Sequence, residues 1–253
     1  DLARYEAMGS IWLVRSTDIE YLAHLGYGES VTVRTYVADF RRIRSRRAYE
    51  LFRGNRGDLI ARAFTDWVFL DSATGRPTEI PEEMMAAFFP EGPPREAPAR
   101  ERFPAAPVPS SGTFRARRRV EWADLDQAKH VNNAAYLTYL EDLAVQMAVS
   151  AGWPPARTEA AGFALLPRRC TLEYLQPAVL NDELELCCWL SSVQDAQVVA
   201  HATIKRAGDG ALVTRARTVW AGVQLGTDRP TQLPETFLAD LAAGLDIGGR
   251  DST

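Results

Sequence analysis

The chain carries an internal repeat at an offset of 153 residues, and no other feature limits its possible folds as strongly. Identical residues recur at this offset over roughly 70 positions without a net gap. The recurring residues include Gly9 and Gly162, Leu13 and Leu166, Glu20-Tyr21-Leu22 and Glu173-Tyr174-Leu175, Trp67 and Trp220, and Arg76-Pro77-Thr78 and Arg229-Pro230-Thr231. Two copies are too few for a solenoid, so we predict two similar domains that pack as a pseudo-dimer.

A proline-rich stretch separates the two copies. Residues 90–112 hold seven of the 15 prolines, and such density removes sheet hydrogen-bond donors and favours an extended chain. We therefore predict a first domain over residues 1–89, a linker over 90–112 and a second domain over 113–243. Counted back by the offset, the first copy would start about 40 residues before Asp1. We expect this copy to be truncated at its N-terminus and to lack its first strand and most of its helix, with residues 1–9 as the tail of that helix.

The composition excludes several classes of function. The 253 residues have a net charge of −4, which disfavours bulk binding of nucleic acid. No stretch approaches the roughly 20 apolar residues of a membrane span. The three cysteines, Cys170, Cys187 and Cys188, match neither a disulfide framework nor a zinc site. We therefore expect a cytoplasmic protein with reduced cysteines, no metal, no cofactor, no membrane span and no nucleic-acid partner.

Hydrophobic periodicity predicts one strand, one long helix and four more strands in the second copy. The strands are expected at Phe114–Trp122, Ala164–Leu175, Glu183–Gln194, Gln197–Ala207 and Leu212–Leu225, and the helix at Asn133–Ser150 with Asn132 or Asn133 as its N-cap. The first copy repeats the last four strands, at Trp12–Tyr21, Ser30–Asp39, Arg44–Phe52 and Ile60–Leu70. A helix packed on a curved antiparallel sheet is an α+β arrangement.

The segment between the first strand and the helix of the second copy concentrates reactive groups. Asp126 can act as a nucleophile or as a general base toward a water, and the sequence leaves both roles open. His130 can orient the carboxylate or transfer a proton, and the alternatives are a helix-capping aspartate and a structural histidine. The first amides of the helix, at Val131, Asn132 and Asn133, suit a carbonyl oxygen that gains negative charge. We assign Asp126 and His130 to catalysis and Val131, Asn132, Asn133 and Tyr136 to substrate binding.

Arginines crowd two stretches of predicted strand, Arg41–Arg47 and Arg115–Arg119. Such a face would suit an acidic carrier protein or the phosphates of coenzyme A. The alternative is a solvated sheet face with cross-strand ion pairs.

Four stretches of the sequence resemble the acyl-acyl carrier protein thioesterases of bacteria and plants. They are Trp122-x-Asp124-Leu125-Asp126-x-x-x-His130-Val131-Asn132-Asn133-x-x-Tyr136, Thr171-Leu172-Glu173-Tyr174, Arg42-Ile43-Arg44-Ser45-Arg46-Arg47 and Ala63-Phe64-Thr65-Asp66-Trp67-Val68. The resemblance implies a tandem (double) hotdog fold of the 4-hydroxybenzoyl-CoA thioesterase-like superfamily, in which a curved sheet wraps a long helix. It implies hydrolysis of fatty acyl thioesters of acyl carrier protein or coenzyme A, with Asp126 and His130 as the catalytic pair. A homodimer is also left open.

The sequence departs from the plant members at two places. Ala128 stands where they have an asparagine, and Pro177-Ala178 stand where they have an acidic residue followed by cysteine. The simpler scheme that relies on one acidic residue survives at Asp126, which we expect to be buried beside a cavity long enough for a fatty tail. Two alternatives remain, a hotdog enoyl-thioester hydratase and a non-catalytic acyl-thioester-binding module.

Overall fold

The computed structural model describes residues 8–55, 57–92, 99–109, 112–194, 196–227 and 229–247. The chain divides into two compact units, Asp1–Phe103 and Pro104–Thr253. The boundary between them falls within the predicted linker. The helix tail predicted over residues 1–9 lies almost wholly outside the described residues.

The first unit is an antiparallel sheet with one short helix. Its strands are β1 (Ser10–Tyr21), β2 (Val31–Arg41), β3 (Arg44–Arg53) and β4 (Leu59–Asp71), and they lie in the order β2-β3-β4-β1. The helix α2 (Glu82–Phe88) follows them. Its core is a small cluster in which Phe40, Phe69 and Ile80 are buried and Trp12 packs on Phe69 with ring centroids 4.8 Å apart.

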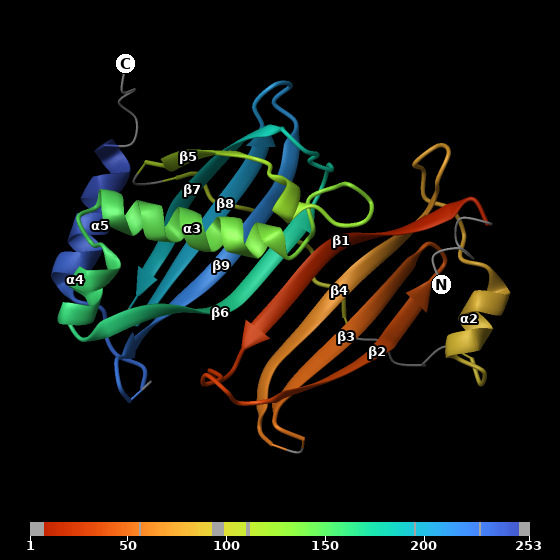
Figure 1. The fold of residues 1–253 in the computed structure, drawn as a ribbon, viewed down its shortest axis with the longest axis horizontal. Coiled ribbons are helices and arrows are strands. Elements are labelled where there is room, and N and C mark those ends of the chain that lie inside the picture. The colour runs from red at the N-terminus through yellow and green to blue at the C-terminus, as the bar shows by residue number, and fades with distance from the viewer. Residues whose placement is uncertain are drawn as a thin grey trace. The chain divides into compact units, whose positions relative to one another are not determined.

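The second unit combines five strands with a long helix (Figure 1). Its strands are β5 (Phe114–Arg119), β6 (Phe163–Tyr174), β7 (Glu183–Gln194), β8 (Gln197–Arg206) and β9 (Leu212–Gln224), in the order β6-β9-β8-β7-β5. The helix α3 (Ala135–Ser150) lies across one face of this sheet, and α4 (Pro155–Ala160) and α5 (Glu235–Ile247) gather at its C-terminal end. A short 3₁₀ turn, η1 (Trp122–Asp124), leads from β5 toward α3.

Helix α3 packs on the sheet because its apolar residues recur at helical spacing. The buried members are Tyr136, Tyr139, Leu140, Leu143 and Met147. At the end of the helix, the rings of Trp153, Phe163 and Phe237 pack together with centroids 5.2 to 5.9 Å apart. The core of the second unit therefore sits between α3, α5 and the sheet.

Backbone pairing repeats at the offset predicted from the sequence. In the first unit Trp12 pairs with Phe69, and in the second unit Leu165 pairs with Gly222. Each residue of the second pair lies 153 positions after its counterpart in the first pair. The β-bulges repeat as well, because the shift between Val14 and Ser16 returns between Pro167 and Arg169. The same holds for the β2–β3 and β7–β8 hairpins, whose bulges follow Val37 and Leu190. The repeat is thus a repeat of hydrogen-bond register as well as of residue type.

The predicted strands agree with the structure within a few residues, and the one predicted helix corresponds to α3. The sequence prediction missed η1, α2, α4 and α5. Pro155 occupies the first position of α4, where proline is favoured. Among the described residues, no helix has the length and apolar character that crossing a membrane requires.

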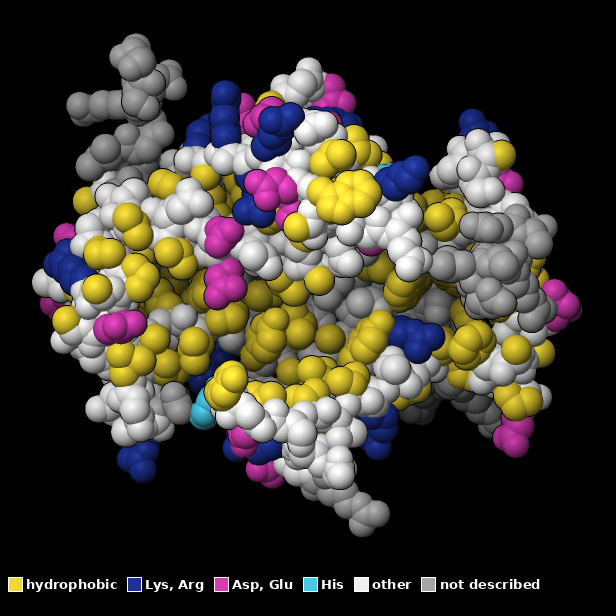
Figure 2. Space-filling model, viewed as in Figure 1, with side chains coloured by type: hydrophobic (Ala, Val, Ile, Leu, Met, Phe, Trp, Pro, Cys, Tyr) yellow, Lys and Arg dark blue, Asp and Glu magenta, His cyan; other side chains and the backbone are white. Residues whose placement is uncertain are grey.

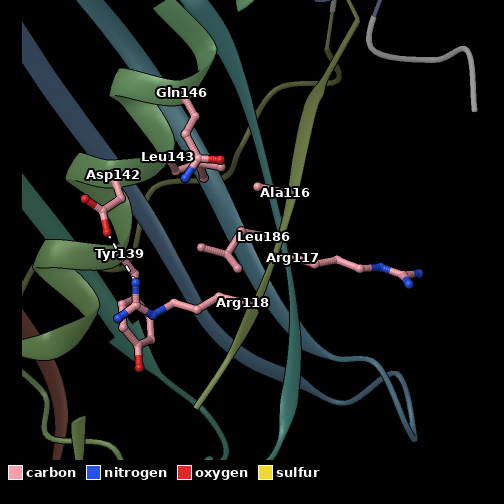
Figure 3. A pocket seen from close by; sticks show the side chains of 8 residues that line it. All are labelled: Ala116, Arg117, Arg118, Tyr139, Asp142, Leu143, Gln146 and Leu186. Carbon is pink, nitrogen blue, oxygen red and sulfur yellow. Dashed lines mark hydrogen bonds and ion pairs between the residues drawn. The ribbon is translucent and has the colours of Figure 1, made fainter. Parts of the chain in front are cut away.

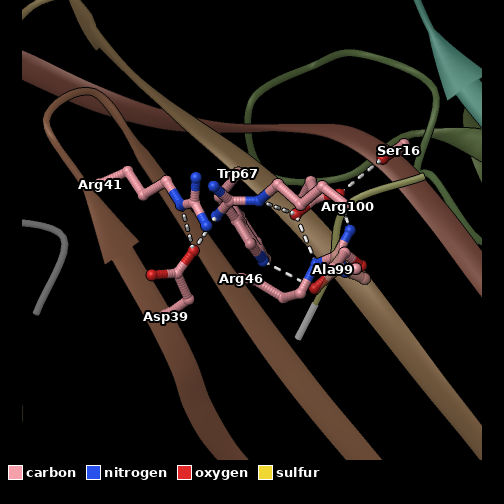
Figure 4. A network of polar contacts seen from close by, with 9 residues as sticks. Ser16, Asp39, Arg41, Arg46, Trp67, Ala99 and Arg100 are labelled. Atoms are coloured by element: carbon pink, nitrogen blue, oxygen red, sulfur yellow. Dashed lines mark hydrogen bonds and ion pairs between the residues drawn. The ribbon is translucent and has the colours of Figure 1, made fainter. Parts of the chain in front are cut away.

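Two linker residues, Ala99 and Arg100, bind charged side chains of the first unit (Figure 4). Arg46 of β3 donates to both carboxylate oxygens of Asp66 on β4, at 2.9 and 2.6 Å, and to the carbonyl of Ala99 at 2.7 Å. Arg100 in turn reaches Asp66 at 3.0 Å and Asp39 at 3.1 Å. This network, formed by Asp39, Arg46, Asp66, Ala99 and Arg100, joins three strands' side chains to the linker.

Candidate active site

The segment between β5 and α3 holds Asp126 and His130 on one short turn. Leu125 and Val131 pair as an isolated antiparallel bridge that closes this turn. Inside it, the amide of Asp126 donates to the carbonyl of His130 at 2.9 Å. Lys129 completes the turn with a φ of 60°, in the left-handed region. Asp126 and His130 therefore stand opposite each other at the two ends of the turn.

The carboxylate of Asp126 is exposed, which corrects the expectation of a buried acid. The turn projects from the sheet, and Oδ1 of Asp126 accepts a hydrogen bond within it, from the amide of Ala128 at 2.9 Å. The imidazole of His130 is half-buried, and no hydrogen bond joins the two side chains among the described residues. The sequence-predicted pair is thus brought onto one turn without direct contact between the reactive groups.

The start of α3 also differs from the prediction. The helix begins at Ala135, two residues later than predicted, with Ala134 at the N-cap and no side-chain cap. Asn132 forms a turn of its own before the helix, since its Oδ1 accepts the amide of Ala134 at 2.9 Å. Neither Asn132 nor Asn133 therefore serves as the N-cap.

Two of the three predicted amide donors are already engaged. The amide of Val131 donates to the carbonyl of Ala178 at 2.9 Å, and that of Asn132 donates to the carbonyl of Asp124 at 2.8 Å. These two bonds connect the turn to neighbouring segments before the helix starts. The amide of Asn133 has no acceptor within the described part of the chain, so it is free to polarise a carbonyl oxygen.

Tyr136 is buried in the core at the start of α3. Its ring packs against the rings of Tyr139 and Tyr174, with centroids 5.6 Å apart in both cases. Burial raises the pKa of the Tyr136 phenol above its usual value, so this group stays protonated. The hydroxyl of Tyr174 donates to the carbonyl of Asn133 at 3.1 Å and so ties the helix start to β6. Contact between Tyr136 and a substrate stays a prediction.

The segment after β6 lies beside the same turn. Ala178 is fully buried, and Val179 pairs with His130 as an isolated bridge. The position at which plant members have an acid and a cysteine thus adjoins the turn. Here it carries Pro177 and Ala178, which supply no titratable group.

Sequence reasoning missed Arg118, which it counted only among the arginines of a basic stretch. Burial alternates along β5, so Phe114, Ala116 and Arg118 share its inner face. Arg118 forms an ion pair with Asp124 at 3.4 Å, and Asp124 is buried. Strand alternation is the signal that could have separated Arg118 from its exposed neighbours.

A hollow lies between α3 and the paired strands β5 and β7 (Figure 3). It is lined by Ala116, Arg117, Arg118, Tyr139, Asp142, Leu143, Gln146 and Leu186. The hollow is partly open to solvent and is well below the volume of typical ligand pockets. Neither Asp126 nor His130 lines it, so this hollow is not the acyl cavity expected beside Asp126.

Most arginines of the two basic stretches are paired with acids. The pairs are Arg41 with Asp39, Arg42 with Glu79, Arg46 with Asp66, Arg117 with Glu185, Arg118 with Asp124 and Asp142, and Arg119 with Glu183. Charged side chains of both signs are interspersed on the visible face (Figure 2). This agrees with the alternative of cross-strand ion pairs on a solvated sheet, and docking of a carrier on these arginines stays a prediction.

The described residues contain no group of three or more His, Cys, Asp or Glu side chains arranged to hold a metal ion. None of the three cysteines forms a disulfide bond.

A long helix packed across an antiparallel sheet is the arrangement of the hotdog fold. Two solved structures share this fold. A putative oleoyl thioesterase from Lactobacillus plantarum superposes with a TM-score of 0.65 and 21% identity, over 92% of this chain and 80% of that one. The 12:0-ACP thioesterase from Umbellularia californica gives 0.67 and 19%, over 90% and 76%.

Sequence comparisons match both parts of the chain to known families. Residues 3–88 match the acyl-ACP thioesterase N-terminal domain, and residues 120–241 match the thioesterase-like superfamily. These matches confirm the resemblance to acyl-ACP thioesterases noted in the sequence.

The chain is similar to named plant enzymes over part of their length. It is 24% identical over 213 residues to a chloroplastic palmitoyl-acyl carrier protein thioesterase of Cuphea hookeriana, which covers 83% of this chain and 48% of that protein. The corresponding protein of Arabidopsis thaliana is 26% identical over 223 residues, covering 83% and 50%. The chain thus spans about half the length of the curated relatives that it matches.

Proposed function

We propose that this chain hydrolyses fatty acyl thioesters, carried by acyl carrier protein or by coenzyme A, to a free fatty acid and a thiol. The observation that supports this is the position of Asp126 and His130 at the two ends of one turn, directly ahead of the free amide of Asn133. The match of residues 3–88 to the acyl-ACP thioesterase N-terminal domain supports a fatty acyl thioester as the substrate.

In the proposed reaction the thioester oxygen points at the amide of Asn133. Such a donor is typically worth ~3 kcal/mol to a transition state in which the oxygen gains negative charge. Asp126 either attacks the carbonyl carbon, so that water later cleaves the acyl-enzyme, or removes a proton from the attacking water. In both routes a carbon–oxygen bond forms, the carbon–sulfur bond breaks, and the departing thiolate takes a proton, which His130 can deliver.

The length of the acyl chain is the open part of the substrate proposal. Each buried methylene contributes only about 0.8 kcal/mol, so a few pocket side chains decide the preference. The named relatives are palmitoyl enzymes, which makes long-chain acyl carrier protein the first substrate to test. A reducing, cytoplasmic location is part of this proposal, and three cysteines without a disulfide are compatible with it.

The central test is Asp126→Ala. We expect it to lower kcat by ~100-fold or more on acyl thioesters, because general acid–base or nucleophilic groups commonly contribute at least this factor. Assays on a panel of acyl-ACP and acyl-CoA chain lengths give the rates, and circular dichroism shows whether the variant is folded. Glu141→Gln is the matched control, since Glu141 is an exposed carboxylate on the same helix that follows the turn. Turnover near the wild-type rate in folded Asp126→Ala would remove Asp126 from the mechanism.

A second candidate function is binding of acyl thioesters without turnover. The observation that favours it is that no hydrogen bond joins the Asp126 and His130 side chains among the described residues, together with Ala128 and Pro177, which replace groups that plant members use. Tight binding of an acyl thioester that is recovered intact would support it against hydrolysis. Addition of water to a crotonyl thioester would instead support the hydratase alternative.

A further inference from the structure

Arg118 differs from its neighbours on β5 in the direction that it faces. Arg117 and Arg119 lie on the outer face of this edge strand, and their side chains are 77% and 63% exposed. Both pair with glutamates of β7. Arg118 is 31% exposed and turns inward toward α3 (Figure 3). Adjacent positions of β5 therefore carry arginines that face outward and one arginine that faces inward.

The guanidinium of Arg118 joins three elements. Nη1 lies 3.3 Å from Oδ2 of Asp142 on α3, and Nη2 lies 3.4 Å from Oδ1 of Asp124 in η1. Its Cζ stands 4.2 Å from the ring centroid of Tyr139, a stacked cation–π geometry. Tyr139 is fully buried, so the surface that Arg118 stacks on is part of the core. One side chain of the edge strand is thereby fixed to both the 3₁₀ turn and the helix.

Asp124 is tied to both ends of the turn that carries Asp126 and His130. Its Oδ2 accepts the amide of Glu121 at 2.8 Å, which closes η1. Its carbonyl accepts the amide of Asn132 at 2.8 Å, just after the turn. Any displacement of Asp124 would therefore shift the entry and the exit of the turn together.

The charge of Asp124 needs a partner because its residue is only 9% exposed. Tyr139 cannot supply a positive charge, because a phenol is either neutral or negative, and burial followed by the Asp124 carboxylate raises its pKa and keeps it neutral. Arg118 is the cation that pairs with Asp124 among the described residues. Removal of one member of a buried ion pair leaves the other uncompensated and favours rearrangement.

We propose that Arg118 is a positioning residue. It holds Asp124, and through Asp124 it fixes the turn that carries Asp126 and His130 against the start of α3. Arg118 does not touch the reacting atoms. Its effect on turnover rests on the proposed thioesterase function, whereas its effect on the turn does not.

The test compares Arg118→Met with Arg117→Met. Arg118→Met keeps an unbranched chain about as long as the arginine stem and removes the guanidinium and its charge. We expect kcat to fall about 10- to 100-fold, as misplacement by about 1 Å can produce. KM should change much less, and the pH profile of kcat/KM should keep its shape because Arg118 does not titrate in this range. Arg118→Lys should restore part of the rate, since it keeps the charge but loses the planar stack. Arg117→Met, one residue away on the outer face, should match the wild type.

A second arm does not depend on turnover. Hydrogen–deuterium exchange of the segment 122–135 reports directly on the amides of Asp126 and Asn132. We expect faster exchange there in Arg118→Met, an intermediate rate in Arg118→Lys, and the wild-type rate in Arg117→Met. Arg118→Lys covers the case in which Arg118→Met does not fold.

The outcomes separate the two proposals. A wild-type protein that hydrolyses no acyl thioester, with a loosened turn in Arg118→Met, contradicts the proposed function and supports the positioning role. An active wild type with unchanged exchange in Arg118→Met contradicts the positioning role, whatever happens to kcat. Asp124→Asn combined with Arg118→Met should be no slower than the worse single variant, and additive losses would also count against it.

Discussion

Single side chains in this protein take their properties from partners that stand far away in sequence. His201 is an example, since its buried ring stacks on Trp189 with centroids 5.7 Å apart, and its Nε2 lies 2.9 Å from Oγ of Ser191. Burial first, and the charge of Arg217 on the paired strand second, lower the pKa of His201 below its ordinary value. The indole of Trp189 in turn donates to the carbonyl of Pro107 in the linker. His201 therefore has a structural role, and protonating its ring in the folded protein costs electrostatic free energy.

The depressed pKa of His201 gives stability a defined pH dependence. The unfolded chain takes up a proton near the ordinary pKa of about 6.5, whereas the folded chain resists it, so stability falls as the pH drops below that value. The limiting slope is about 1.4 kcal/mol per pH unit. We expect His201→Gln to flatten the decline of Tm between about pH 7 and pH 5. His24→Gln, at an exposed histidine, is the control and should keep the wild-type slope.

At the scale of elements, the two copies have matching strands, but the side-chain contacts between those strands differ. The network of Asp39, Arg46, Asp66, Ala99 and Arg100 links β2, β3 and β4 to the linker. At the offset of 153 the positions of Arg46 and Asp66 hold Val199 and Val219, so apolar side chains replace this ion pair in the second unit. The repeat therefore preserved the register of the strands and changed the chemistry on one face of the sheet.

Asp66 should contribute most of the stability of that network. Burial alone would raise its pKa, but the hydrogen bonds and charges of Arg46, and then of Arg100, outweigh it and hold the pKa below the ordinary 3.8. A depressed carboxyl pKa adds stability above 3.8 that is lost as the pH falls through the folded value. We expect Asp66→Asn to cost about 1–3 kcal/mol near neutral pH, because the two arginines lose their acceptor, and less in acid. Urea unfolding at both pH values measures this.

The control for Asp66 is Glu20→Gln. Glu20 pairs with Arg62 across β1 and β4, with side chains 37% and 57% exposed. A pair in solvent contributes at most about 1 kcal/mol, so this variant should stay close to the wild type at both pH values. Equal losses of unfolding free energy in the two variants would contradict the larger contribution that we assign to Asp66.

At the scale of the whole molecule, the two units differ in the core that each contains. Unit 2 has α3 and α5 on its sheet, and Leu143, Leu172 and Phe237 are almost completely buried there. The described part of unit 1 has a sheet, the short α2 and a cluster around Phe40 and Phe69. Area removed from water is the main favourable term in folding, so the two units should differ in independent stability.

We therefore expect residues 104–253, expressed alone, to unfold cooperatively on heating with a helical circular dichroism signal. Residues 1–103 alone should give no cooperative transition, because their sheet has too little apolar cover. Thermal melts of both fragments beside the full chain measure the difference. A cooperative melt of the first fragment at the temperature of the full chain would contradict this expectation.

Local periodicity by itself determined the strands and the long helix, and residue identity at a fixed offset determined the repeat. Alternation along Glu183–Gln194 and the helical spacing from Tyr136 to Met147 depend on neighbours within a few residues, and both agree with the structure. The stretch from Trp122 to Tyr136, with three others, carried the resemblance to the acyl-ACP thioesterases, since each is a contiguous run of residue types.

Only the tertiary structure decided which groups in that motif are exposed, engaged or paired. Asp126 is in solvent, the amides of Val131 and Asn132 are bonded to Ala178 and Asp124, and Arg118 reaches Asp124 from another element. Each of these facts depends on how β5, the segment after β6 and α3 approach the turn. Contacts between such segments arise from packing of the whole unit, which no short window of sequence contains.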